Sequence, residues 1–112
     1  MTTNAFPLKE LRDPKRFASH FDLSLAQLAE VSGLPEEDLI NKTPSAEQRL
    51  HEMVTILELA MPLCTNEFEA LRWYRNEKIP GLADHTGESL VKSGKADAVI
   101  QHLKRIQEGG FA

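Results

Sequence analysis

Apolar residues recur along this chain at intervals of three and four positions, which is the period of a helix that packs on one side. The pattern is clearest between residues 50 and 61, where one helical stripe carries Leu50, Met53, Val54, Leu57 and Met61. No segment sustains the apolar–polar alternation of a half-buried strand, and proline and glycine stand between the helical segments. The pattern therefore predicts an all-α protein.

Polar capping residues mark the starts of the first two predicted helices. Asp13 is placed to accept hydrogen bonds from the first turn of a helix over residues 14–21, and Ser24 precedes a second helix. The second helix is expected to offer three small or apolar side chains to a core: Leu25, Leu28 and Ala29.

Gly33 is predicted to form a tight turn after the second helix, because glycine adopts a positive φ without steric cost. Pro35 suits the first position of a third helix, and Pro44 ends that helix by pushing the residues before it out of helical geometry. Two short helices joined by such a turn around a small leucine core are typical of a helix-turn-helix, and the leucines are Leu28, Leu34 and Leu39.

Capping-box spacing predicts the starts of the next two helices. Ser45 and Gln48 are spaced to begin the long fourth helix, which Pro62 ends. Asn66 and Glu69 are spaced to begin a fifth helix, whose apolar and aromatic residues are Phe68, Leu71, Trp73 and Tyr74.

A proline-glycine turn at residues 80–81 separates the fifth helix from two more. A short helix is predicted over residues 86–92, ended by Gly94, and a last helix is predicted over residues 96–108. Glycines at residues 109–110 end the last helix, and its apolar stripe consists of Val99, Leu103 and Ile106.

The third helix carries acidic residues where a DNA-reading helix contacts bases, at its N-terminal and outward-facing positions. These positions hold Pro35, Glu36, Glu37 and Asn41. Glutamate can accept a hydrogen bond from cytosine, but phosphates repel its charge. Against the helix dipole, Glu36, Glu37 and Asp38 each contribute roughly 0.3–1 kcal/mol of stabilisation. We therefore expect these carboxylates to stabilise the helix more than they read DNA.

The net charge of -4 at pH 7 also differs from the basic surface with which DNA-binding domains neutralise phosphates. A cluster of basic residues near the N-terminus is a local exception. A solvated helix face is the simpler interpretation of this cluster, and phosphate contact is the alternative. Together with one lysine further along, the candidate DNA-binding residues are Lys9, Arg12, Lys15, Arg16 and Lys42.

The reactive side chains indicate neither catalysis nor metal binding. Cys64, the single cysteine, follows the apolar end of a helix and is expected to be a buried, inert thiol. None of the histidines is paired at the helical spacing of a metal site, so all are expected at the surface: His20, His51, His85 and His102. The sequence contains no phosphate-binding loop or nucleotide fingerprint. We expect no catalytic residues, no metal site and no cofactor.

The cysteine content and the N-terminal residues predict a cytoplasmic protein. A single cysteine cannot form an intrachain disulfide, which fits a reducing compartment. The first residues, MTTNAFPLKEL, lack an apolar signal segment, and no apolar run approaches membrane-spanning length. We therefore expect no association with a membrane.

Short motifs follow one another in a fixed order along residues 66–112. They are ALRW at residues 70–73, IP at 79–80, Thr86 after a glycine-containing turn, LV at 90–91, Gly94, and EGGFA at 108–112. In this order they resemble the toxin-binding domain of the Xre/MbcA/ParS antitoxin family. The chain departs from the family pattern at Tyr74, where leucine is common, and at Gly87, where proline is frequent. The resemblance extends more weakly over the preceding helix-turn-helix region.

The resemblance implies an all-helical antitoxin that self-associates, with a homodimer expected, and that neutralises a RES-domain toxin that attacks NAD. In this family the C-terminal end of the antitoxin approaches the toxin's active site and blocks substrate entry. Carried over to this chain, the interface includes Trp73 and Arg75, and the blocking tail consists of Gly109, Gly110, Phe111 and Ala112. Family members commonly repress their own operon, so operator DNA is a second expected partner. Residues 1–62 would then be the helix-turn-helix-like region and residues 63–112 the toxin-binding domain.

Two other functions are compatible with the same sequence. A stand-alone helix-turn-helix transcriptional regulator would bind an operator in a salt-dependent manner, through the basic residues near the N-terminus. A structural adaptor of the same fold would have no toxin partner, and loss of its last two residues would change nothing. Phe111 itself can serve as an aromatic anchor in a partner's pocket, or it can fold back over the last helix of its own chain.

Overall fold

The computed structural model describes residues 7–109 of the chain. This part contains seven α-helices and two short 3-10 helices, joined by loops, and no β-strand. In chain order the elements are η1 (Leu8–Arg12), α1 (Pro14–His20), α2 (Leu25–Ser32), α3 (Glu36–Asn41), α4 (Pro44–Ala60), η2 (Met61–Leu63), α5 (Glu67–Asn76), α6 (Gly87–Lys92) and α7 (Ala96–Gly109). An isolated antiparallel bridge between Lys78 and Thr86 closes the loop from α5 to α6. The predicted all-α class is confirmed.

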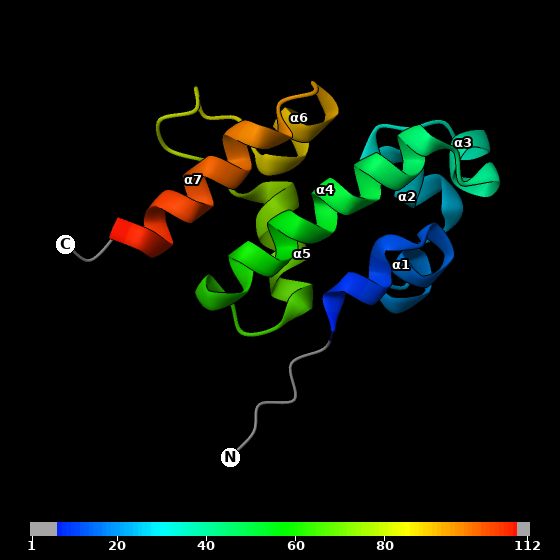
Figure 1. Ribbon diagram of the computed structural model, residues 1–112, viewed down its shortest axis with the longest axis horizontal. Coiled ribbons are helices and arrows are strands. Elements are labelled where there is room, and N and C mark those ends of the chain that lie inside the picture. Colours follow the sequence, from blue (N-terminus) through cyan, green and yellow to red (C-terminus); the bar gives the residue numbers. More distant parts are fainter. Residues whose placement is uncertain (1–6, 110–112) are drawn as a thin grey trace, which may run out of the picture.

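Helix α4 runs through the middle of the molecule, and η1, α5 and α7 pack against it (Figure 1). Its residues Leu50, Met53, Val54 and Leu57 are fully buried, as the apolar stripe predicts. Ile56 lies outside that stripe and is also fully buried, because α4 has neighbours on more than one side. The sequence pattern therefore identified one face of the central helix and missed part of the other.

The local signals of the first two helices are confirmed. The Asp13 carboxylate accepts a hydrogen bond from the backbone N–H of Arg16 (3.1 Å), and Ser24 forms a reciprocal capping box with Gln27 (3.0 and 2.8 Å). Gly33 ends α2 with a φ of 75°. At the starts of α1 and α2, side-chain acceptors bind backbone N–H groups that lack helical partners. At the end of α2, the left-handed Gly33 donates its N–H to the carbonyl of Ala29.

The predicted capping box at the start of α4 is wrong. The N-cap is Thr43, whose hydroxyl accepts a hydrogen bond from the backbone N–H of Ala46 (3.2 Å), and Ser45 lies inside the helix. Pro44 occupies the first helical position, where its missing N–H costs nothing and its fixed φ favours the helix. The proline that ends the third predicted helix thus also begins the fourth. Pro35 likewise precedes α3 as its N-cap instead of its first residue.

The start of α5 agrees with the sequence, whereas α6 begins at Gly87, one residue after the predicted start at Thr86. The side chain of Asn66 accepts from the backbone N–H of Glu69 (3.0 Å) at the start of α5, and Thr86 does the same for Ser89 (3.1 Å) at the start of α6. At its other end α4 stops at Ala60 and passes into η2, two residues earlier than Pro62 itself.

One buried cluster extends from Leu8 in η1 to Leu103 in α7 and crosses the predicted boundary between residues 62 and 63. Helix α4 precedes that boundary, and it packs against α5 and α7, which follow it. Helices α2 and α6 are also in contact. The division into residues 1–62 and 63–112 stays a prediction. Helices on both sides of this boundary contribute side chains to the same hydrophobic core.

Candidate partner-binding surfaces

Helix α5 presents the two residues that the family resemblance places at a toxin interface. Its inner face buries Ala70, Leu71 and Tyr74, and this leaves Trp73 and Arg75 half-buried on neighbouring faces. The start of α6 approaches α5 closely, because a Cβ atom at Gly87 would lie 3.3 Å from the Tyr74 ring. The departure from the family pattern at Gly87 therefore coincides with a site where two helices nearly touch.

A buried carboxylate anchors Arg75, and sequence reasoning did not identify it. Glu88 on α6 is only 9% exposed, and its Oε1 accepts from Arg75 Nε at 2.9 Å while its Oε2 accepts from Lys92 Nζ at 3.1 Å. Such charge-assisted hydrogen bonds fix side-chain geometry more firmly than neutral ones. The spacing of Glu88 and Lys92 was the available signal for half of this network, since residues four apart share a helix face.

A groove of about 330 Å³ lies beside Trp73, between α5 and the segment that follows α4. Its lining mixes apolar and polar side chains: Leu63, Cys64, Thr65, Glu69, Arg72, Trp73, Asn76 and Glu77. Leu63 is 49% exposed, and Phe68 on the first turn of α5 is 51% exposed. The Cys64 thiol is half-buried rather than fully buried, and burial raises its pKa. A raised thiol pKa lowers the thiolate fraction, which fits the predicted inert cysteine.

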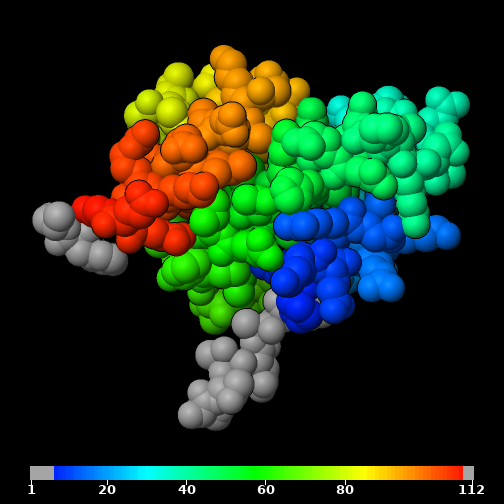
Figure 2. Space-filling view, in the orientation of Figure 1, coloured from blue at the N-terminus to red at the C-terminus, as the bar shows by residue number. Residues whose placement is uncertain are grey.

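The end of α7 lies at the edge of the molecule, next to the end of α4 (Figure 1, Figure 2). The Gln107 side chain donates a hydrogen bond to the backbone carbonyl of Leu59, which fixes the last turns of α7 to α4. Gln107, Glu108 and Gly109 are exposed. Gly110, Phe111 and Ala112, the rest of the predicted blocking tail, lie outside the described residues.

The turn between α2 and α3 is held by side chains from later helices. Tyr74 donates from its hydroxyl to the carbonyl of Val31 (3.4 Å), and Arg49 donates to the carbonyl of Ser32. A Cβ atom at Gly33 would lie 2.6 Å from Cγ of Lys92, so the stem of that lysine passes directly over the turn. Carbonyls at a helix C-terminus lack intrahelical partners, and here two of them are satisfied by α4 and α5.

The outer face of α3 combines the predicted acids with an apolar residue. Glu36 and Glu37 are exposed and Asp38 is half-buried, all in the first turn of the helix. Asn41 is exposed, and Ile40 is 63% exposed. This face offers two free carboxylates where a DNA-reading helix would need groups that tolerate nearby phosphates.

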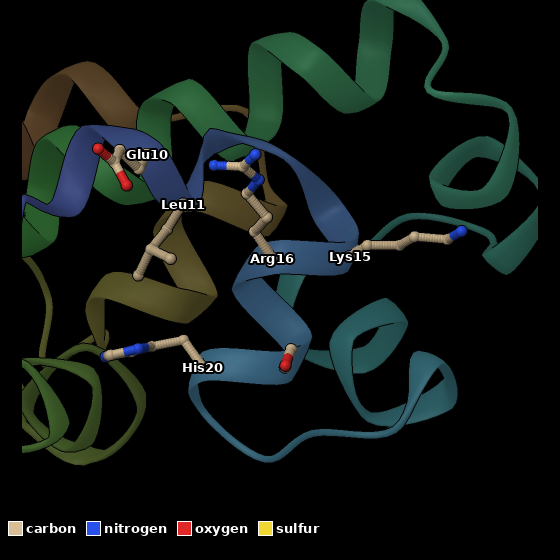
Figure 3. A pocket seen from close by; sticks show the side chains of 6 residues that line it. Glu10, Leu11, Lys15, Arg16 and His20 are labelled. Atoms are coloured by element: carbon tan, nitrogen blue, oxygen red, sulfur yellow. The ribbon is translucent and has the colours of Figure 1, made fainter.

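Two of the candidate DNA-binding residues, Lys15 and Arg16, lie beside a cavity of about 370 Å³. Its other lining residues are Glu10, Leu11, Ser19 and His20. Lys15 and Arg16 point in different directions from α1, and His20 points toward α5 (Figure 3). The two basic groups therefore do not converge on one position.

Lys42 is paired with an acidic residue instead of standing free. Its Nζ lies 2.6 Å from Oδ1 of Asp13, and the hydrogen bond from Lys42 is the main reason why the pKa of Asp13 is lowered. Arg12 and Lys42 line a second cavity, of about 340 Å³, together with Asp13, Pro14, Glu47 and His51. Lys9 is exposed on η1. Acidic residues thus interrupt the predicted basic cluster.

His20 is not the surface histidine that the sequence suggested. Its Nε2 lies 2.7 Å from Oε2 of Glu67, and its ring stacks on Phe68 with ring centroids 5.3 Å apart. The His20 and Glu67 side chains are 18% and 14% exposed. His51 and His85 are exposed and His102 is half-buried. Within residues 7–109, no three histidine, cysteine or acidic side chains are grouped so that they could hold a metal ion.

Comparisons with models of known protein families, with curated proteins and with solved structures found no match to this chain. Among the helices of the described region, none has both the length and the apolar character needed to cross a membrane.

Proposed function

We propose that this protein is an antitoxin, which neutralises a RES-type, NAD-degrading toxin by covering the toxin's active site with the residues that follow α7. The ordered motifs along residues 66–112 suggest this function. The observation that carries it furthest is the position of the α7 end. The Gln107 side chain fixes this end to α4, and its last residues are exposed at the edge of the molecule. Gly109, the last described residue, is thus at the surface, where a partner has access.

The chemistry of the tail fits occlusion of a pocket. Gly109 and Gly110 allow the chain to leave the helix direction, and Phe111 supplies an aromatic side chain. Aromatic anchors that fill a partner's pocket are typical interface hot spots. A short tail of this kind can block substrate entry without contributing catalytic groups.

Helix α5 provides a second contact area for the same partner. Trp73 lines the groove beside η2, and Leu63 adds an exposed apolar side chain at that groove. Arg75 is half-buried and held by Glu88, so it can present its guanidinium in a fixed orientation. A groove of mixed lining, with an oriented arginine on the same helix, suits a partner surface that combines apolar and acidic residues.

Co-expression with the protein encoded by the neighbouring gene tests the proposal. We expect the whole chain to restore cell growth and NAD level, and a chain that lacks Gly110–Ala112 to fail. A Glu30→Gln variant is the control, because it changes an exposed side chain on α2, away from α7. A harmless neighbour, or equal rescue by the truncated chain, would contradict the proposal.

Operator binding by a dimer of this chain is a second candidate function. The connection of α2 to α3 through Gly33, with a φ of 75°, favours it, because this is the turn that a helix-turn-helix needs. The exposed Glu36 and Glu37 and the pairing of Lys42 with Asp13 count against strong binding by a single chain.

Fluorescence anisotropy with a labelled fragment of the chain's own upstream DNA tests this second function. If operator binding occurs, affinity should fall steeply with salt, and removal of charge at Arg12, Lys15 and Arg16 should reduce that salt dependence. Binding that is equally weak for upstream and unrelated DNA would reject a regulatory role.

A further inference from the structure

Glu88 lies between helix α5 and the α2–α3 turn, and it contacts Arg75 on α5 and Lys92, whose stem packs against that turn. It joins α6 to α5 through Arg75, and within α6 it pairs with Lys92 at the spacing of one helical turn. The Glu88 side chain is 12% exposed, whereas the side chains of Arg75 and Lys92 are each 36% exposed, so both bonds run from a buried carboxylate to cations at the surface. Charge-assisted hydrogen bonds of this kind are shorter and stronger than neutral ones.

Lys92 carries this connection to the turn between α2 and α3. A Cβ atom at Gly33 would lie 2.6 Å from Lys92 Cγ and 3.2 Å from Lys92 Cβ, so the lysine stem rests on the turn backbone. Its charged end is fixed by Glu88, which leaves the stem little freedom to move away. The turn amides of Gly33 and Leu34 both donate to the carbonyl of Ala29, at 2.8 and 3.2 Å.

Arg75 uses only part of its guanidinium in this arrangement. Its Nε donates to Glu88, and within residues 7–109 its Nη atoms have no hydrogen-bond partner. One carboxylate also serves two cations, so the three side chains together keep a net positive charge. An arginine fixed at Nε presents its Nη groups as a fork that matches a carboxylate or phosphate.

We propose that Glu88 is a positioning residue, which orients Arg75 toward an acidic group of the partner and at the same time holds Lys92 against the α2–α3 turn. The role assigned to Arg75 rests on the proposed function. The link from Glu88 to the turn does not, because it can be measured on the protein alone. A single carboxylate thereby sets the geometry of Arg75 on α5 and of Lys92 at the α2–α3 turn.

Nuclear magnetic resonance of the full-length chain, without any partner, tests the positioning role. Glu88→Gln keeps the size of the side chain and removes its charge. We expect it to speed exchange of the Arg75 Nε proton and of the Gly33 and Leu34 amides with solvent by about threefold or more. Core amides of α4 should keep their exchange rates. Glu69→Gln is the matched control, since Glu69 pairs with Arg72 on α5 and contacts neither Arg75 nor Lys92.

Two further variants test separately the two arms of the network, which are the bond from Glu88 to Arg75 and the bond from Glu88 to Lys92. Lys92→Gln is expected to speed exchange at Gly33 and Leu34 and to leave the Arg75 Nε proton unchanged, whereas Arg75→Gln should leave the turn amides unchanged. The proposal is overturned if Glu88→Gln affects neither arm. It is equally overturned if exchange accelerates uniformly through α4, because that pattern means general loss of stability.

Partner recognition is tested with Arg75→Lys and the purified protein encoded by the neighbouring gene. Lysine keeps the charge but lacks the planar fork, so we expect binding to weaken at least tenfold. Unchanged affinity would overturn the recognition role of Arg75 and leave the link to the turn standing. Failure of the unmodified chain to bind would instead count against the proposed function, which keeps the two ideas distinguishable.

Discussion

Tyr74 shows how one buried side chain joins distant parts of the chain. It is fully buried on α5, and its hydroxyl reaches the carbonyl of Val31 at the end of α2. Burial raises the pKa of Tyr74 well above its ordinary value of 10.0, since the phenolate would lose its hydration. The folded state thus favours the neutral phenol. The stabilisation that results is complete below the unfolded pKa and is lost as pH rises toward the folded one.

Replacement of Tyr74 by phenylalanine tests this assignment. We expect Tyr74→Phe to lower the free energy of unfolding near neutral pH by about 0.5–1.5 kcal/mol, because a hydrogen bond is lost. The variant should also lose less stability than the wild type between about pH 10 and pH 11. Urea unfolding of both proteins near neutral pH, at about pH 10 and at about pH 11 measures the two effects.

Because Tyr74 is the single tyrosine of the chain, its ultraviolet titration provides an independent check. The folded wild type should show no phenolate absorbance near pH 10. Ordinary titration at that pH would contradict the buried assignment.

The Asp13–Lys42 pair affects stability at the acidic end of the pH range. A lowered pKa for Asp13 means that its stabilising effect is present above the ordinary value of 3.8 and is lost as pH falls through the folded value. Both side chains are partly exposed, so the pair contributes only about 0.2–1 kcal/mol. Asp13→Asn should lose this amount at about pH 7 and close to nothing at about pH 2, because asparagine still caps α1. Chemical denaturation measures the difference.

The same substitution in a Lys42→Met background is the control for the pair. There Asp13→Asn should have a smaller effect at about pH 7, since the partner charge is already absent and only the backbone hydrogen bonds at the start of α1 still favour the carboxylate. An undiminished loss would assign the effect of Asp13 to its capping role and not to Lys42.

At the scale of single helices, the sequence predicted most starts and turns because their causes lie within three or four residues. Asp13, Ser24 and Asn66 all cap the helices that follow them, as predicted. The cap of α4 was misplaced, since Thr43 and Ser45 both fit the sequence signal and only the position of Pro44 decides between them. The start of a helix is predicted well when only one nearby residue can act as the N-cap. It is predicted poorly when two neighbouring residues could do so.

Gly33 and Gly94 form a matched pair for testing the α2–α3 turn. Both have a positive φ, of 75° and 79°, so alanine at either position should cost about 1–2 kcal/mol in backbone strain. A Cβ at Gly33 would also overlap Lys92, whereas nothing lies within 4 Å of one at Gly94. We expect Gly33→Ala to cost roughly 1 kcal/mol more than Gly94→Ala in urea unfolding. Equal costs would mean that Lys92 does not press on the turn.

At the scale of the whole molecule, the connections between elements lay beyond sequence reasoning. His20 and Glu67 are 47 residues apart, and Arg75 meets Glu88 across a loop. No periodicity or capping signal indicates such pairs, because they depend on how α1, α5 and α6 are placed around α4. The motifs at residues 66–112 suggested Trp73 and Arg75 as interface residues, but the carboxylate that orients Arg75 became visible only in the fold.

Inhibition of NAD consumption by the purified neighbouring-gene protein is the most direct test of the central claim. The whole chain and a chain lacking Gly110–Ala112 would each be titrated into that reaction, with binding measured in parallel. If the residues after α7 block the active site, the whole chain stops NAD consumption, while the truncated chain still binds through α5 and leaves NAD consumption running. Equal inhibition by both chains, or none by either, would contradict the account.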